Sequence, residues 1–171
     1  MANRYKRRPE CVSSGNSIMP DTSYCIRLMD KNDALHQNAL EYFKHFLTEK
    51  IIMHVSAIVI AEYTVGDDPA NLPLNNLQIE SFDFINGKTA GLFHRTIKGD
   101  KSNIQDYNRR IVANDVKILA QIQNKKIEGI ISKDPDSFKH YITPLINSAT
   151  LQLKFIDLNI PLNQALGQLY T

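Results

Sequence analysis

The chain has 171 residues, 43% of them hydrophobic, which is enough apolar material for the core of one compact domain. The formal net charge is +2, and the excess is local, because Arg4, Lys6, Arg7 and Arg8 against Glu10 give the first ten residues +3 and leave −1 for the other 161. No stretch reaches the roughly 18 apolar residues of a membrane span, and no signal peptide is recognisable, so we expect a soluble, cytoplasmic protein without a membrane partner.

The usual sequence patterns of zinc sites and nucleotide-binding loops are missing. Cys11 and Cys25 form neither a Cys-x-x-Cys pair nor a Cys/His zinc spacing, so we expect free thiols. The histidines are scattered singly, and there is no Gly-x-Gly-x-x-Gly or Gly-Lys-Ser/Thr loop. Any metal site in this chain must therefore be built from oxygen ligands.

The chain begins with a basic segment and then a strand followed by helices. We interpret residues 1–16 as a solvated basic leader, although basic clusters of this kind also bind nucleic acid phosphates. Residues 17–20 predict a short strand that stops at Asp21, and residues 24–29 begin a helical pattern. In residues 33–50, apolar side chains recur every three or four positions, which predicts an amphipathic helix.

A second strand and helix follow. Residues 51–55 are apolar on both faces and rich in β-branched side chains, as in a strand buried inside a parallel sheet. Ser56 can cap the next helix, predicted over residues 57–65, which carries Glu62. Glycine, aspartate and proline then predict a polar loop over residues 66–76.

The middle of the chain has a weaker pattern. Residues 77–82 alternate like an edge strand, and residues 84–97 predict a helix despite two glycines. Residues 98–108 are polar and predict a loop. Residues 111–125 carry a regular apolar stripe and predict a helix, with Asp115 near its start.

The last part of the chain repeats the strand and helix pattern. Residues 129–132 predict a short buried strand ending before Asp134, and residues 138–148 a helix that Pro144 interrupts. Residues 151–156 alternate cleanly and predict the last strand. Residues 161–171 have leucines at helical spacing and are either a tail with a short helix or a partner surface.

Strands that alternate with helices predict an α/β fold, a three-layer α/β/α sandwich around a mainly parallel sheet. We assign residues 17–160 to this domain. In such sheets ligands bind beyond the carboxyl ends of the strands. Asp21 and Asp134 follow strands and Glu62 and Asp115 lie in helices that approach the same edge, so all four can converge.

Four carboxylates in one cleft repel each other and call for a hard divalent cation, Mg²⁺ or Mn²⁺, which can activate water for phosphodiester hydrolysis. We therefore expect at least one of them to be protonated at a pH above its ordinary range. Each acid also has an ordinary explanation. Asp21 and Asp134 can cap helices, Glu62 can be surface charge, and Asp115 can complement a helix dipole.

The neighbours of the four acids favour the metal site. Residues 18–23 read IMPDTS, 59–63 VIAEY, 114–121 NDVKILAQ and 130–134 IISKD. In order and spacing, these segments resemble the successive motifs of PIN-domain ribonucleases, with the VapC-like toxins of bacterial toxin-antitoxin systems as the nearest branch. The similarity runs from about residue 18 to residue 156.

The resemblance implies a PIN-like α/β/α sandwich that cleaves RNA with Mg²⁺ or Mn²⁺. It places Asp21, Glu62, Asp115 and Asp134 at the metal-binding and catalytic positions. Ser132 stands where many members have threonine, and with Thr22 it is expected to hydrogen-bond the ligands. Asp136 is a second acid beside Asp134; which of the two meets the metal stays open, and we favour Asp134.

The resemblance also implies an antitoxin protein and a homodimer. Cations between the second and third acids are candidates for contact with the RNA backbone. They are Arg95, Lys98, Arg109 and Arg110. Two alternatives remain, a non-catalytic PIN-like RNA-binding module and an RNA-processing nuclease without an antitoxin. A structure-specific flap nuclease usually has a longer chain.

Overall fold

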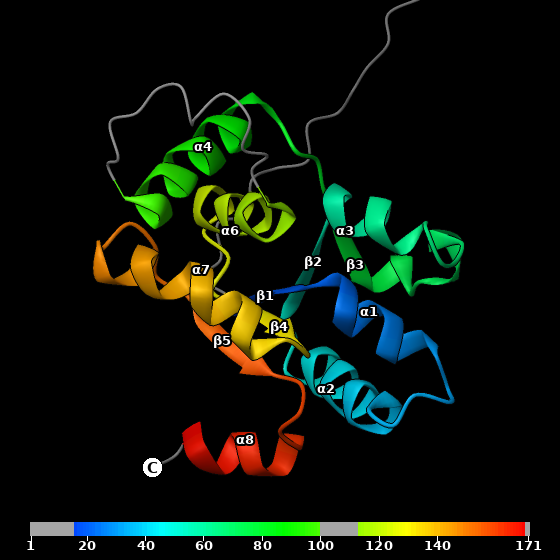
Figure 1. Cartoon of the computed structure of the whole chain (residues 1–171). Helices are drawn as coiled ribbons and strands as arrows, with labels where there is room; N and C mark the ends of the chain where they lie inside the picture. Colours follow the sequence, from blue (N-terminus) through cyan, green and yellow to red (C-terminus); the bar gives the residue numbers. More distant parts are fainter. Residues whose placement is uncertain (1–15, 100–112, 170–171) are drawn as a thin grey trace, which may run out of the picture.

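The structure is a computed structural model that describes residues 16–99 and 113–169 (Figure 1). Most of the basic leader, together with Arg109 and Arg110, lies outside these ranges. The described residues contain a five-stranded parallel sheet with the strand order β3-β2-β1-β4-β5. In that order the strands are Leu77–Glu80, Ile52–Ser56, Ser17–Pro20, Gly129–Ser132 and Lys154–Asp157.

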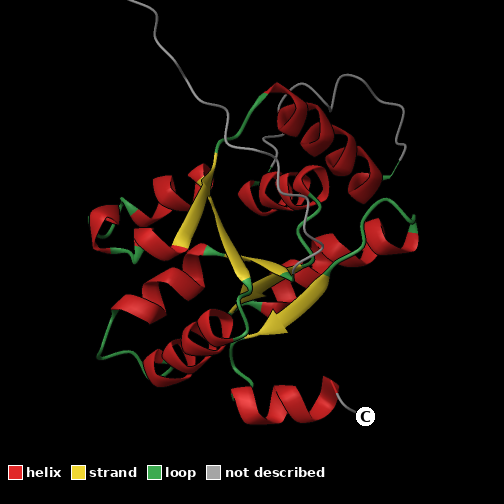
Figure 2. Cartoon of the chain, turned by 180° about the vertical axis from the view of Figure 1, so that it is seen from behind, coloured by secondary structure: helices red, strands yellow, loops and turns green. Residues whose placement is uncertain are grey.

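Helices cover both faces of the sheet (Figures 1 and 2). They are α1 (Thr22–Met29), α2 (His36–Thr48), α3 (Ala57–Tyr63), α4 (Phe84–Lys98), α6 (Asn114–Lys125), α7 (Pro135–Asn147) and α8 (Leu162–Leu169). Helix α1 packs on α2 and α3, while α4, α6 and α7 pack on one another. The predicted α/β/α sandwich is confirmed, and none of the helices in the described ranges is long and apolar enough to cross a membrane.

The direction of the chain through the sheet explains the two layers. From β1 the strands are added in one direction to β2 and β3, and the chain then returns past β1 to β4 and β5. Because crossovers between parallel strands are right-handed, the two halves place their helices on opposite faces. The direction reverses between β1 and β4, and such a switch point is where ligands bind in open α/β sheets.

The core explains why the short strands are stable. Met19 of β1 and Ile130 and Ile131 of β4 are fully buried, as expected for interior strands of a sheet covered on both faces. In α6, Val116, Leu119 and Ile122 form the buried stripe that the sequence pattern predicts. The register pairs Pro20 with Ile131, so the ends of β1 and β4 lie side by side.

Several element boundaries differ from the sequence-based expectation. The last strand begins only at Lys154, and α7 begins at Pro135, because Asp134 caps it and proline suits the first helical turn. The predicted interruption at Pro144 is wrong, since α7 runs through it to Asn147. Pro144 lies in the last turn, and the buried side chains Ile142 and Leu145 hold that turn on the core.

The segment after the last strand is fixed by α2. Asn38 Nδ2 donates hydrogen bonds to the carbonyls of Leu158 (2.6 Å) and Ile160 (3.1 Å), and the Tyr42 hydroxyl donates to the Ile160 carbonyl (3.1 Å). These bonds direct the chain into α8, which lies below α2 in Figure 1. The described part of this stretch contains the helix α8.

Candidate functional site

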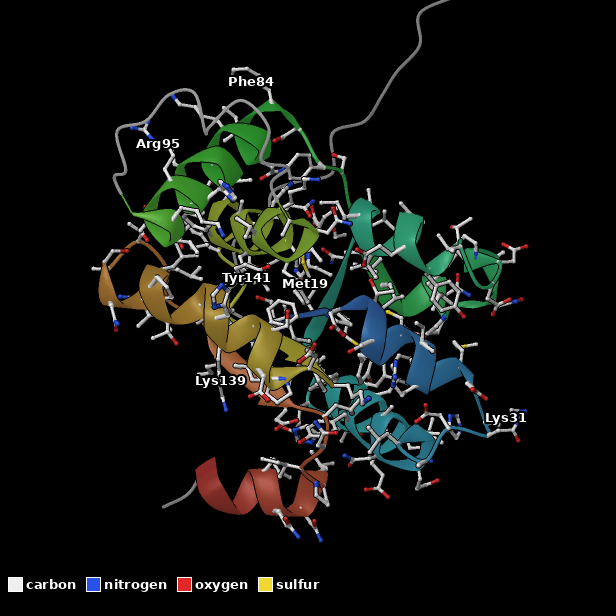
Figure 3. All side chains as sticks on the ribbon, viewed as in Figure 1. Met19, Lys31, Phe84, Arg95, Lys139 and Tyr141 are labelled. Carbon is white, nitrogen blue, oxygen red and sulfur yellow. The ribbon has the colours of Figure 1, made fainter. Side chains whose placement is uncertain are left out.

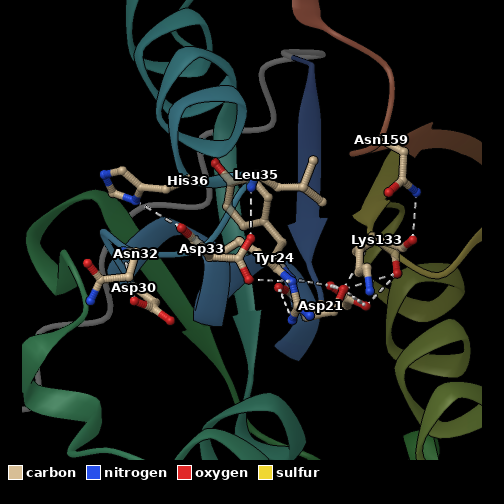
Figure 4. Close-up of polar contacts among 12 residues, drawn as sticks. Asp21, Tyr24, Asp30, Asn32, Asp33, Leu35, His36, Lys133 and Asn159 are labelled. Atoms are coloured by element: carbon tan, nitrogen blue, oxygen red, sulfur yellow. Dashed lines mark hydrogen bonds and ion pairs between the residues drawn. The ribbon is translucent and has the colours of Figure 1, made fainter.

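Asp21 lies at the switch point, directly after β1. It is only 6% exposed, and its backbone N–H donates to the Ile131 carbonyl (3.1 Å), which extends the β1–β4 pairing by one bond. The carboxylate accepts hydrogen bonds from the Tyr24 backbone N–H at Oδ1 (2.8 Å) and from Ser132 Oγ at Oδ2 (2.6 Å). Ser23 Oγ also donates to it, 2.8 Å from Oδ1. Asp21 therefore caps α1 and reaches across to β4 at the same time (Figure 4).

The electrostatic state of Asp21 follows from its burial. Desolvation of the carboxylate raises its pKa to about 6, against an ordinary value of 3.8. The hydrogen bonds from Ser132, Tyr24 and Ser23 oppose this rise, and the charge of Asp115 adds to it. The expectation of a carboxyl with a raised pKa is thus confirmed, but burial is a larger cause than repulsion between the acids.

Two serine hydroxyls join the β1–α1 corner to the loop between β4 and α7. Ser132 Oγ accepts a hydrogen bond from the Asp134 backbone N–H (3.0 Å), and Ser23 Oγ accepts one from the Lys133 backbone N–H (2.9 Å). Asn159 Nδ2 donates to the Lys133 carbonyl (2.8 Å) and closes the loop from the other side (Figure 4). This loop, and Asp134 with it, is therefore positioned relative to Asp21.

Asp134 is the capping residue of α7, and its Oδ1 accepts a hydrogen bond from the Ser137 backbone N–H (3.1 Å). Asp136 lies in the first turn of α7, and both carboxylates are exposed. Asp134, and not Asp136, is among the charges that raise the pKa of Asp115. The ordinary capping explanation thus holds for both Asp21 and Asp134, but it does not exclude a metal site, because a capping carboxylate keeps further lone pairs.

Asp115 is half-buried in the first turn of α6, and its Oδ2 accepts a hydrogen bond from Ser137 Oγ (3.0 Å). Burial raises the pKa of Asp115, and the charges of Glu62 and Asp134 raise it further, whereas the bond from Ser137 lowers it. Asp115 thus interacts electrostatically with each of the other three acids.

Glu62 of α3 is held at both carboxylate oxygens. The Thr22 hydroxyl donates to Oε2, and Asn114 Nδ2 donates to Oε1 (2.6 Å). Lys117 Nζ in turn donates to Asn114 Oδ1 (3.1 Å). Thr22 opens α1 and Asn114 opens α6, so Glu62 connects the two helices that begin beside Asp21 and Asp115.

The four predicted acids therefore lie at one edge of the sheet, and Asp115 is within electrostatic reach of the other three. Their donors are all oxygens, which suits a hard cation such as Mg²⁺ or Mn²⁺. As the side chains lie, however, each carboxylate faces a hydroxyl or amide donor, and no three acidic, histidine or cysteine side chains in the described ranges converge enough to hold an ion. Ion binding would require some of them to exchange these partners.

The predicted RNA-contacting cations are not brought together with the acids by any contact in the described part of the chain. Arg95 and Lys98 lie in the last turns of α4 and are exposed. Figure 3 shows Arg95 pointing outward from α4. Lys117, which the sequence pattern did not single out, lies nearer, because it bonds Asn114 beside Glu62.

Three hydrogen-bonding residues of the site were missed by the sequence interpretation. Ser23, Asn114 and Ser137 each donate to one of the acids. A signal existed for Ser23 and Asn114, because both are short polar residues near an acid at a helix start. Ser137 also lies near acids at a helix start, but it donates its hydroxyl to Asp115, 22 residues away, and this pairing leaves no local signal.

Solved structures share this fold. No family model and no curated protein sequence matches the chain. A chain of the VapBC2 structure from Rickettsia felis, bound to a promoter DNA fragment, matches with a TM-score of 0.52 and 20% identity, over 82% of this chain and 99% of its own. A chain of the DNA-bound VapBC structure from Salmonella typhimurium matches with a TM-score of 0.51 and 14% identity, over 82% and 98%. The protein thus has the PIN-domain fold that its motifs predict.

Proposed function

We propose that the protein is a metal-dependent endoribonuclease that hydrolyses RNA phosphodiester bonds. The proposal rests on Asp21, a buried carboxylate at the switch point. Its pKa is raised by burial and, to a smaller extent, by the negative charge of Asp115. Asp21 caps α1, but at neutral pH its ionised carboxylate is disfavoured by desolvation and by repulsion from Asp115, and no cation pairs with it in the described ranges. A bound cation would offset both costs.

Mg²⁺ or Mn²⁺ fits the charge and the chemistry of the donors, and Asp21, Asp115 and Asp134 would hold it together with Glu62. When bound, such an ion supplies an activated water and neutralises charge on the phosphate. Ser132 and Ser23 orient the Asp21 carboxylate by hydrogen bonds, Thr22 and Asn114 orient Glu62, and Ser137 orients Asp115. The Ser137 backbone N–H donates to Asp134. Each of the four acids is therefore held by hydroxyl or amide groups, which do not titrate near neutral pH.

RNA approaching these acids requires cations close by. In the described part of the chain none of the four acids forms an ion pair with lysine or arginine. Two cationic side chains there are each linked to an acid through one intervening residue. Lys117 reaches Glu62 through Asn114, and Arg27 reaches Asp21 through Ser23 but is already paired with Asp33. The Lys117 ammonium bonds the neutral Asn114 amide and keeps its charge available for a phosphate. We assign the first backbone contact to Lys117 and more distant contacts to Arg95, Lys98, Arg109 and Arg110.

A toxin role with an antitoxin partner is the biological setting that we propose, because chains of two VapBC complexes share the fold. A homodimer and action in the cytoplasm are parts of the same proposal. A non-catalytic module is less well supported, since loss of catalysis would remove the need to keep Asp21 buried beside other acids. A processing enzyme without an antitoxin would use the same site chemistry.

The proposal is tested by incubating the full chain with single-stranded RNA and a titration of Mn²⁺, with EDTA and Ca²⁺ as controls. We expect internal cleavage that appears with Mn²⁺ or Mg²⁺ and stops on chelation. Cleavage that persists in EDTA would contradict metal dependence. Binding of RNA without cleavage at any metal concentration would favour the non-catalytic module.

A further inference from the structure

Two fully buried polar side chains, Ser56 and Gln121, lie between the helix that carries Glu62 and the helix that carries Asp115. Neither touches the four acids, and the chemistry proposed above uses neither. Buried polar groups of this kind are costly unless every hydrogen-bonding position is satisfied, so their partners indicate what they hold together.

All the hydrogen-bonding groups of this pair have partners. Ser56 Oγ accepts from the Ile58 backbone N–H (3.0 Å), which caps α3, and donates to Gln121 Oε1 (2.5 Å). Gln121 Nε2 donates to the backbone carbonyls of Glu80 (3.3 Å) and Ser81 (3.2 Å), where the chain leaves β3. Because these carbonyls can only accept, the Gln121 amide has one orientation, with its oxygen toward Ser56.

The position of the pair determines what it can control. Glu62 stands six residues after Ser56 on α3, and Asp115 stands six residues before Gln121 on α6. Helix α3 has only seven residues, too few to be stable without tertiary contacts. Its second polar link to α6 is the bond from Asn114 to Glu62. The Ser56–Gln121 bond therefore fixes the start of α3, and the Asn114–Glu62 bond fixes its end.

We propose that Ser56 and Gln121 are positioning residues that hold α3 against α6, so that Glu62 stays in place relative to Asp115. The catalytic part of this inference rests on the proposed ribonuclease function, whereas the link between the helices does not. A purely local role, in which each side chain only satisfies nearby backbone groups, would stabilise the protein without connecting α3 to Gln121.

The link is tested by changing a residue on α6 and observing α3. In Gln121→Met the side chain keeps its length and loses its hydrogen bonds. We expect the backbone amides of residues 57–63 to exchange hydrogen about tenfold faster, the effect of losing about 1.4 kcal/mol of local stability. The matched control is Asn86→Leu, because Asn86 is a buried amide that also donates to the Ser81 carbonyl (3.3 Å) and bonds α6 through Asn124 (2.9 Å).

In Asn86→Leu we expect α3 to exchange as in the wild type, although the whole protein is less stable. Equal exchange of α3 in both variants, whether slow or fast, would overturn the inference. This readout requires neither metal nor RNA. It therefore decides the link even if the wild type cleaves no RNA, a result that would overturn the proposed function alone.

The catalytic consequence has its own readout. We expect Gln121→Met and Ser56→Ala to lower kcat for single-stranded RNA about tenfold with KM unchanged, because RNA contact does not involve these residues. Ser56→Thr, which keeps the hydroxyl, should restore kcat relative to Ser56→Ala. If α3 exchanges faster in Gln121→Met but kcat is unchanged, the positioning role is overturned. It is also overturned if Ser56→Thr has a kcat as low as that of Ser56→Ala.

Discussion

Ser132 donates a hydrogen bond of 2.6 Å to Asp21, a residue 111 positions earlier in the chain. The bond crosses from β4 to the end of β1, where the direction of strand addition reverses. It joins two of the four sequence segments that resemble PIN-domain motifs and places a buried carboxylate at the edge where open α/β sheets bind their ligands. The candidate site is organised around this pair.

The raised pKa of Asp21 makes stability depend on pH. A carboxyl whose pKa rises on folding from 3.8 to about 6 favours the folded state below the lower value, and this contribution is lost as the pH rises through the folded value. At 1.36 kcal/mol per pKa unit, the full contribution is about 3 kcal/mol, of which about 2 kcal/mol is lost between pH 4 and pH 7. Asp21→Asn should therefore gain about 2 kcal/mol over the wild type on going from pH 4 to pH 7. Urea unfolding in EDTA measures this difference, and the exposed Asp136→Asn is the control; a pH-independent difference would contradict the assignment.

The Ser132 hydroxyl should lower the pKa of Asp21. The bond from Ser132 is the largest of the contributions that lower the pKa of Asp21. Ser132→Ala should therefore raise the pKa of Asp21 further, by about one unit for a hydrogen bond to a charged group. NMR titration of the carboxyl carbons in the metal-free protein measures the shift. Ser148→Ala, at the far end of α7, should leave Asp21 unchanged, and a downward shift in Ser132→Ala would be inconsistent with this bond.

Measurements of stability and of RNA cleavage should distinguish the roles of Asp134 and Asp136, the two neighbouring acids at the start of α7. Asp134→Ala removes the cap of α7 and is expected to cost about 1 kcal/mol of stability. Asp134→Asn keeps a capping oxygen, so its stability should stay near that of the wild type while RNA cleavage falls at least about a hundredfold. Asp136→Asn should match the wild type in thermal unfolding and in kcat. Loss of activity in Asp136→Asn alone would assign the metal to the rival acid.

The contact assigned to Lys117 predicts a change in salt dependence. Each phosphate contact on single-stranded nucleic acid contributes about 0.7 to the slope of log K against log salt concentration. In an Asp21→Asn background that prevents cleavage, Lys117→Gln should reduce this slope by about 0.7. Lys139→Gln removes the same charge from an exposed position on α7 (Figure 3) and should leave the slope unchanged. Equal slopes for the two variants would place the RNA elsewhere.

Much of the fold could be predicted because β2 and β4 are short, apolar and largely buried, and because α2 and α6 carry regular apolar stripes. Boundaries were less predictable. The start of α7 depends on Asp134 acting as a cap, and its course through Pro144 depends on tertiary packing of that turn.

The four acids could be located from sequence because each follows a recognisable local signal. Their hydrogen-bond partners could not be predicted in the same way. Ser137 meets Asp115 across 22 residues and Gln121 meets Ser56 across 65, and neither pairing leaves a pattern in the local sequence. The burial of Asp21, which sets its pKa, likewise depends on packing that appears only in three dimensions.

One acidic site, organised by Asp21, is proposed to hydrolyse RNA with a divalent metal. The most direct measurement is the rate of single-stranded RNA cleavage by the wild type and Asp21→Asn at the same saturating Mn²⁺ concentration, with thermal unfolding of both proteins. We predict that the rate falls at least about a hundredfold in the variant while its unfolding temperature at pH 7 in metal-free buffer is no lower than that of the wild type. A well-folded Asp21→Asn protein that cleaves RNA as fast as the wild type would contradict it.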